Sequence, residues 1–319
     1  MSLAENPAAG RDPNQMWTGA RPRLIAMADV SLKEATRVWA YVGVNSFGGP
    51  AGQIAVMHRE IVDEREWIDE RRFLHALNYC MVLPGPEAQQ LATYVGWLLN
   101  GVRGGVIAGT LFILPGAVVM LALSVLYAVY GDVGWVSGLL FGLQAAVVAI
   151  VVQALIRVAR RTLRTQTLQL ISVAAFVALF FFAVPFPLVI LAAGLIGWWV
   201  GRRDPSPVGD DDLDPPTPPG QRRWALIAAL ASLILWLVPV ALLVVLLGTD
   251  HILTQEALLF SRTAVVSFGG AYAVLAYISQ QAVQYYQWIT TEDMTTGLGL
   301  AETTPGPLIL VVQFVGFLA

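Results

Sequence analysis

The sequence predicts an all-α, polytopic membrane protein, because it is rich in apolar residues, poor in charge and interrupted by glycine and proline at matched places. Of its 319 residues, 56% are hydrophobic and 13% are charged, with a mean hydropathy of +0.65. Soluble domains carry about 25% charged residues, so these few charges could not solvate the surface of a globule. The apolar residues also fall in blocks of roughly 20, which is the length of a helix that crosses a bilayer core.

The apolar blocks define the helices that we expect. Three blocks are long enough to span a bilayer: 104–130, which has Pro115 inside it, 136–156 and 224–248. A single helix over 168–200 would be about 50 Å long, which exceeds a span. Pro185-Phe186-Pro187 disfavours helix continuation, so we expect a hairpin of two helices there. Four further blocks are interrupted near the middle: 37–57, 73–100, 256–282 and 294–319.

The interrupted blocks form an internal repeat with an offset of 221 residues. Ser46-Phe47-Gly48-Gly49 matches Ser267-Phe268-Gly269-Gly270, and Pro84-Gly85-Pro86 matches Pro305-Gly306-Pro307. The same offset carries Trp67-Ile68 onto Trp288-Ile289. One unbroken offset that preserves glycine, proline and tryptophan together predicts two structural copies.

The charges around the two copies predict that they lie in opposite orientations. The loop at 58–72 holds four arginines, whereas the equivalent loop at 279–293 holds no Lys or Arg. Short loops rich in arginine stay on the cytoplasmic side. Five spans separate the copies if 168–200 is a hairpin, and an odd number inverts the second copy. Inverted repeats with broken or re-entrant helices are typical of secondary transporters.

We expect four regions along the chain. They are an N-terminal polar tail at 1–34, a first repeat domain at 35–203, a Pro- and Asp-rich cytoplasmic linker at 204–222 and an incomplete second repeat domain at 223–319.

The breaks are the predicted substrate site. Unpaired backbone groups inside a membrane are tolerated only where they are buried in protein or line a watery cavity. The free N–H groups at the start of a half-helix, with the helix dipole behind them, can bind an anion without a formal positive charge. Close-packing glycines would give the same sequence. The predicted binding residues are Ser46, Phe47, Gly48, Gly49, Pro50, Gln53, Pro84, Gly85, Pro86, Glu87, Gln90, Ser267, Gly269, Gly270, Pro305, Gly306 and Pro307.

Four charged residues are candidates for coupling or gating: Glu60, Glu87, Arg262 and Glu302. A carboxylate at membrane depth is a functional hypothesis by default, although Glu87 could equally cap a helix. Glu302 could bind backbone N–H groups, and Arg262 could extend to the outer headgroups. The charges of 58–72 read mostly as a solvated face. The sequence predicts no metal site, no cofactor and no catalytic residues, and it lacks a nucleic-acid-binding patch.

The breaks and their surroundings resemble the chromate ion transporter family. The resemblance rests on Phe47-Gly48-Gly49-Pro50-Ala51-Gly52-Gln53, on Met57, Glu60 and Trp67, and on Leu83-Pro84-Gly85-Pro86-Glu87-Ala88-Gln89-Gln90-Leu91. The second copy is similar to the second domain of the family's two-domain, long-chain members. The resemblance implies a bacterial inner-membrane protein that exports chromate and confers resistance. Such members continue beyond the second Pro-Gly-Pro, so we expect this chain to be truncated at its C-terminus.

Other functions remain open from the residues alone. Sulfate has the shape and charge of chromate, so a permease for sulfate or a similar oxyanion fits equally well. A membrane enzyme acting on a phosphate-bearing lipid would need paired acids and a basic cluster, which are not visible. A non-transporting regulatory subunit is a further alternative. The expected partners are the oxyanion and membrane lipid, and a homodimer is left open.

Overall fold

The computed structural model describes residues 30–131, 133–163, 165–182, 184, 186–201, 221–267 and 271–319, and within these ranges every regular element is a helix. The first half contains α1 (Leu32–Asn45), α2 (Gly49–His58), the π-helical segment η2 (Arg59–Asp63), α3 (Glu70–Val82), α4 (Glu87–Tyr130), α5 (Gly134–Thr162), α6 (Gln166–Phe181) and α7 (Phe186–Gly201). The second contains α8 (Gln221–Leu247), α9 (Ile252–Val266), α10 (Ala271–Ser279), the π-helical η3 (Gln280–Tyr285), α11 (Thr291–Thr303), the 3-10 segment η4 (Leu308–Leu310) and α12 (Val311–Leu318). The predicted all-α class is confirmed. Most of the predicted tail and linker lies outside the described residues, so the division into four regions stays a prediction.

Three helical stretches are long and apolar enough to cross a membrane: Glu87–Tyr130, Gly134–Gln153 and Leu226–Leu247. None of the apolar window of α8 is buried inside the protein, and α6 has no buried residue. Apolar surface that faces outward on this scale is stable in lipid and not in water. The chain is therefore a membrane protein, as its composition predicts.

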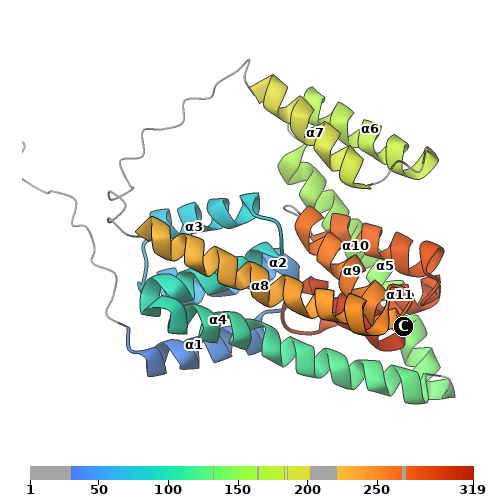
Figure 1. Cartoon of the computed structure of the whole chain (residues 1–319), viewed down its shortest axis with the longest axis horizontal. Coiled ribbons are helices and arrows are strands. Elements are labelled where there is room, and N and C mark those ends of the chain that lie inside the picture. The colour runs from blue at the N-terminus through green and yellow to red at the C-terminus, as the bar shows by residue number, and fades with distance from the viewer. Residues whose placement is uncertain are drawn as a thin grey trace, which may run out of the picture.

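The block at 168–200 forms two helices, α6 and α7, which pack side by side (Figure 1). Each has 16 residues. The Pro-x-Pro motif lies at the junction, where residues 183 and 185 are outside the described part of the chain. The expected hairpin of short helices is the arrangement that the structure adopts.

Helix α4 is two helices that fold back on each other at Asn100 and Gly101, whose backbone angles are not helical. A Cβ atom added to Gly96 would lie 2.5 Å from the Cβ of Ala108, and one added to Gly104 would lie 2.2 Å from the carbonyl oxygen of Gly96. In a straight helix, 12 residues extend about 18 Å. The two parts, residues 87–99 and 102–130, therefore pack as an antiparallel pair along a glycine-lined face.

The predicted repeat recurs in the structure element by element. At the offset of 221, α1 corresponds to α9, α2 to α10, η2 to η3 and α3 to α11. Even the non-glycine residues with positive φ correspond, because Glu66 has φ of 50° and Gln287 has φ of 55°. The residue that follows each of them is a tryptophan, whose backbone N–H donates to the carbonyl six residues earlier. Trp67 donates to Ile61 at 2.8 Å, and Trp288 donates to Ala282 at 2.9 Å. The two copies thus share their local backbone geometry as well as their sequence motifs.

Each copy has its own apolar core, and the second part of α4 contributes to both. The first core surrounds Trp39 and Phe73 and includes Phe112 of α4. The second surrounds Ile278 and Phe314 and includes Met120 of α4. This helix therefore joins the two repeats.

The carbonyl of Leu111, on this joining helix, is approached closely by Gly43 of α1. Pro115 lies inside α4 and has no N–H, so the carbonyl four residues before it lacks its helical donor. A Cβ atom added to Gly43 would lie 2.1 Å from the Leu111 oxygen. Only glycine lets α1 pack this closely against the helix.

Replacing Gly43 with alanine should therefore destabilise the protein, because backbone atoms cannot move aside as a side chain can. Overpacking of this kind typically costs about 1–3 kcal/mol. The thermal midpoint of the purified protein in detergent should fall for Gly43→Ala. The control Gly138→Ala should leave it unchanged or raise it, because nothing lies within 4 Å of the added Cβ. Equal midpoints for the two variants would contradict this account of the contact.

Candidate functional site

The candidate site is the place where breaks from the two repeats meet. The first repeat is interrupted between α1 and α2 and again at Leu83–Pro86, before α4. The second is interrupted after Ser267 and again at Thr304–Pro307, before η4. Of the predicted residues, Gly269 and Gly270 lie outside the described part of the chain.

Two backbone hydrogen bonds join the breaks of one repeat to those of the other. The N–H of Gly85 donates to the carbonyl of Ser267 at 2.6 Å, and the N–H of Gly306 donates to the carbonyl of Ser46 at 2.9 Å. Both donors and both acceptors correspond at the offset of 221. Such reciprocal contacts are those of a two-fold axis, here relating two parts of one chain. The predicted break residues are thus brought together across the repeats.

The glycine of each Pro-Gly-Pro motif makes this contact possible. Gly85 has φ of 124° and Gly306 has φ of 91°, in the region that favours glycine. The flanking prolines cannot donate backbone hydrogen bonds, so the glycine supplies the N–H at the centre of each break.

Helices that begin at the breaks lack side-chain caps. No side chain accepts from the first N–H groups of α2, α4 or η4, whose preceding residues are Gly48, Pro86 and Pro307. Helices that begin elsewhere are mostly capped, as α1 is by Ser31, α3 by Asp69 and α11 by Thr290. The first N–H groups of a helix have no partner within it, so at the breaks they remain available to a ligand.

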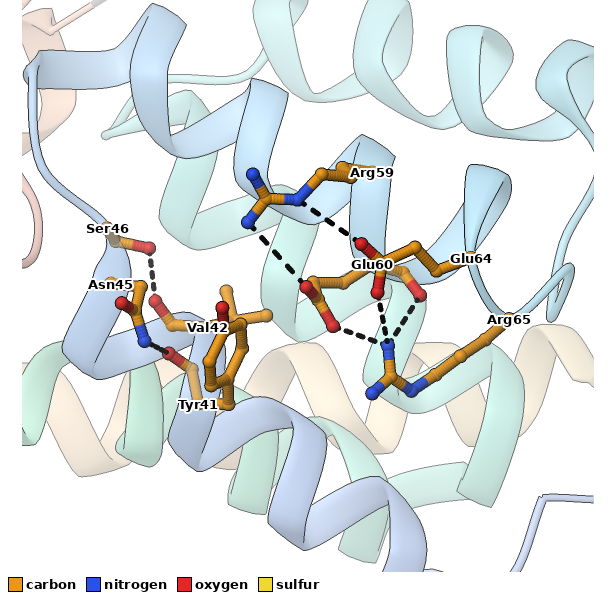
Figure 2. Close-up of polar contacts among 8 residues, drawn as sticks. All are labelled: Tyr41, Val42, Asn45, Ser46, Arg59, Glu60, Glu64 and Arg65. Atoms are coloured by element: carbon orange, nitrogen blue, oxygen red, sulfur yellow. Dashed lines mark hydrogen bonds and ion pairs between the residues drawn. The ribbon is translucent and has the colours of Figure 1, made fainter.

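Ser46 and Ser267 are buried, but each directs its hydroxyl proton back to its own helix. The Ser46 hydroxyl donates to the Val42 carbonyl at 2.6 Å (Figure 2). The Ser267 hydroxyl donates to the Ala264 carbonyl at 3.0 Å. In this conformation the two serines contribute carbonyl acceptors to the junction, not hydroxyl donors.

Gln53 reaches from α2 to the Pro-Gly-Pro break of the other repeat. Its amide nitrogen donates to the carbonyl of Gly306 at 2.5 Å, and its Oε1 atom is buried without a partner. The corresponding residue of the second repeat is Val274, which is buried and apolar. The two contacts between the repeats therefore differ: the Gly306–Ser46 contact has a glutamine side chain beside it, whereas the Gly85–Ser267 contact has Val274 at the equivalent position.

Glu87 is the first residue of α4 and is 9% exposed. Its Oε2 atom is buried and has no hydrogen-bond partner, and its counterpart in the second repeat is the apolar Leu308. The adjacent Gln90 donates to the Pro84 carbonyl at 2.6 Å and has an unpartnered Oε1. The unpaired atoms of these side chains, like that of Gln53, are acceptors, which suit a proton or water more than an anion.

Glu60 is buried in an ion-paired cluster with arginines, on η2 (Figure 2). Its carboxylate accepts from Arg65 and lies 3.7 Å from Arg59. The half-exposed Glu64 suits the expected solvated face, whereas the neighbouring Glu60 is 3% exposed. The guanidinium groups of Arg59 and Arg65 offset the free-energy cost of removing the Glu60 carboxylate from water.

The remaining candidates are placed apart or at the edge of the junction. Arg262 is exposed on α9, and Phe47 is 48% exposed at the end of α1. Glu302 is half-buried two residues before Thr304, which opens the second Pro-Gly-Pro break. Pro50 occupies the first turn of α2, and Pro305 packs its carbonyl against Gly116 of α4.

Two cavities in the described part of the chain contain none of the predicted binding residues. One, of about 410 Å³, is lined by Tyr127, Gln144, Glu292 and Asp293 among others. The other, of about 510 Å³, has Glu256 in its wall. The sequence interpretation missed Glu256, although a single acid inside the apolar stretch 252–266 is the signal that marks it.

A family model described as "Chromate transporter" matches residues 33–198 and 254–319. The chromate transport protein of Pseudomonas aeruginosa is 34% identical over 87% of this chain and 64% of its own length. The probable chromate transport protein of Synechococcus elongatus is 29% identical over 90% of this chain and 69% of its own length. That of Cupriavidus metallidurans is 25% identical over 90% and 68%.

The match thus spans about two thirds of the length of these relatives. No solved structure matches the chain. The family match covers both repeats, including all the break residues that lie in 46–90 and 267–307. The chain belongs to the chromate transporter family, whose model matches it on both sides of the predicted linker.

Proposed function

We propose that this protein carries chromate out of the cytoplasm across a bacterial inner membrane, and that the anion binds where the broken helices meet. The observation that carries the proposal is the set of uncapped helix N-termini at the breaks, ahead of α2, α4 and η4. Their N–H groups and dipoles offer partial positive charge to a tetrahedral dianion. The relatives named as chromate transport proteins support chromate over other oxyanions.

Glu87 gives the site a means of proton coupling. Its carboxylate and a bound dianion would compete for the same helix N-terminus at α4. Like charges disfavour each other, so binding of the anion favours the protonated acid. The unpartnered Oε2 atom is where the proton would reside. We assign gating roles to Glu60 and Glu302, and to Arg262 the capture of anions at the surface.

The membrane potential favours export. Moving one charge through 100 mV is worth about 2.3 kcal/mol, so a dianion leaving a negative interior gains about 4.6 kcal/mol. That supports an outward gradient of roughly a thousand-fold without another ion. Export is therefore the direction that needs least coupling, and it would confer chromate resistance.

Chromate uptake into everted membrane vesicles tests this function. Uptake should depend on the potential, and collapsing the pH gradient alone should separate a proton contribution. Gly85→Ala should reduce uptake at least tenfold, because its φ of 124° is unfavourable for alanine and the added Cβ would lie 2.6 Å from the Gln90 amide nitrogen. Gly142→Ala, with nothing within 4 Å, is the matched control.

Sulfate added in excess distinguishes the second candidate substrate. Strong competition together with sulfate uptake would indicate a general oxyanion permease. Absence of flux in correctly inserted protein would reject transport by this chain and favour a non-transporting membrane subunit.

The difference between Gln53 and Val274 implies that the Gly306–Ser46 and Gly85–Ser267 contacts do not open equally readily. In transporters with inverted repeats, alternating access moves one repeat against the other around a fixed site. Here the Gly306 break is held by the Gln53 bridge, whereas the Gly85 break has no bridge from Val274. The Gly85–Ser267 contact should therefore open more readily than the Gly306–Ser46 contact.

Hydrogen exchange at the two glycine N–H groups tests this inequality. Gln53→Val removes one hydrogen bond, with a net worth of about 0.5–1.5 kcal/mol, so exchange at Gly306 should accelerate about 2- to 10-fold. Exchange at Gly85 should not change. The reciprocal variant Val274→Gln should slow exchange at Gly85, because the two-fold relation places its amide near the Gly85 carbonyl. Equal changes at both breaks in either variant would contradict the asymmetry.

A further inference from the structure

His58 contacts two carboxylates at once, at the start of the segment that joins α2 to α3. Its Nδ1 atom lies 3.2 Å from Asp63 Oδ2, and its Nε2 atom contacts Glu70 Oε2. The ring also packs edge-on against Phe73, with 5.0 Å between the ring centroids. Glu70 and the buried Phe73 both belong to α3, so two residues of that helix hold the ring. His58 lies outside the three stretches that could cross a membrane.

The two contacts together require the charged form of the imidazole ring. An ionised carboxylate accepts hydrogen bonds but cannot donate them, so each ring nitrogen must supply an N–H. A neutral histidine has one N–H and one lone pair, so it can donate to Asp63 or to Glu70 but not to both. The bond that remains also loses its charge assistance. The arrangement in the structure is therefore that of an imidazolium.

Among the described residues, the charges that act on His58 are those of Asp63, from η2, and Glu70, from α3. Its own helix, α2, has no other charged residue. Three arginines of the same segment pair with other acids: Arg59, Arg65 and Arg72. Desolvation lowers the pKa of His58, but the hydrogen bonds and charges of Glu70 and Asp63 outweigh it and raise the pKa above the ordinary value of 6.5. Both contacts are thus complete below pH 6.5 and are lost as the pH rises through the raised pKa.

These contacts join two helices whose other ends lie at the breaks of the first repeat. Helix α2 begins at the first break, and α3 ends at the second. His58 is the last residue of α2 and Glu70 is the first residue of α3. The equivalent positions of the second repeat hold Ser279, Gln284 and Thr291, which carry no charge. A response to protons at this place therefore belongs to the first repeat alone.

We propose that His58 is a positioning residue, which with Asp63 and Glu70 forms a proton-dependent clamp between α2 and α3. The charged ring holds the end of α2 against the start of α3, and so constrains how the two breaks of the first repeat lie relative to each other. The neutral ring releases one carboxylate, and α3 is then freer to move against α2. The clamp does not include the junction of the breaks, so the proposal does not depend on which anion is carried.

NMR of the purified full chain, labelled at histidine, tests the protonation of His58. The chain has three histidines, and the His58 signal is the one lost in His58→Gln. The pKa should lie above 6.5 in the wild type and should fall in Glu70→Gln, which keeps the shape of the side chain but removes its charge. Glu64→Gln, at a half-exposed acid that pairs with arginines, is the matched control and should leave the pKa unchanged. A wild-type pKa at or below 6.5, or one that Glu70→Gln leaves unchanged, would overturn the proposal.

Hydrogen exchange at about pH 6 and about pH 8, on either side of the transition expected for His58, tests the release of α3. After correction for the intrinsic pH dependence of exchange, protection of α3 should be about two- to fivefold lower at the higher pH, as for the loss of an exposed ion pair. Helix α11, the counterpart of α3, is the internal control and should keep its protection.

The variants separate the clamp from other effects of pH. His58→Gln has no titrating group at this position, so its α3 should lose the pH response, and Glu70→Gln should reduce the response while the histidine remains. Equal responses of α3 and α11 in the wild type would contradict the clamp, as would a full response in both variants. Neither readout contains chromate, so both are independent of the transport assay.

Discussion

The structure depends on satisfying backbone polar groups where helices stop inside a membrane. A broken helix in hydrocarbon exposes N–H and carbonyl groups, each of which is costly to leave unpaired. Here the two repeats satisfy each other, because Gly85 donates to Ser267 and Gly306 donates to Ser46. The breaks can therefore exist only as a set. The helix starts beside them keep N–H groups that no side chain caps, and these make a site from backbone alone.

The two repeats share their backbone geometry, but several of their equivalent side chains differ. Gln53 corresponds to Val274 and Glu87 to Leu308. The ion-paired Glu60 and Arg65 correspond to Gln281 and Tyr286, which carry no charge. The first repeat thus carries the polar chemistry of the breaks, and the second supplies mainly backbone. Identical halves would make the two end states of an alternating-access carrier equal in free energy, and these side-chain differences remove that equality.

Much of the fold follows from the sequence because glycine, proline and charge act locally. The breaks at 46–49, 84–86 and 305–307 and the helix pair at 168–200 were predictable from residues that cannot continue a helix. The reversal of α4 at Asn100–Gly101 was visible only as a short gap between apolar blocks. Burial of Glu60 was not predictable, since it depends on Arg65 folding back across the π-helical turn. Glu256 could not be identified from the repeat, because its counterpart in the first copy is the apolar Ala35.

The reciprocal bonds also set the order of events during synthesis. The Gly85 N–H must wait for Ser267, roughly 180 residues later, and the Ser46 carbonyl must wait still longer, for Gly306. At about 5–20 residues per second, that interval is roughly 10–40 s. During it the first repeat is in or near the bilayer with its breaks unpaired, so water, lipid headgroups or the insertion machinery must occupy them. The chain is consequently most exposed to misfolding and to quality-control proteases during the period in which only its first half has been synthesised.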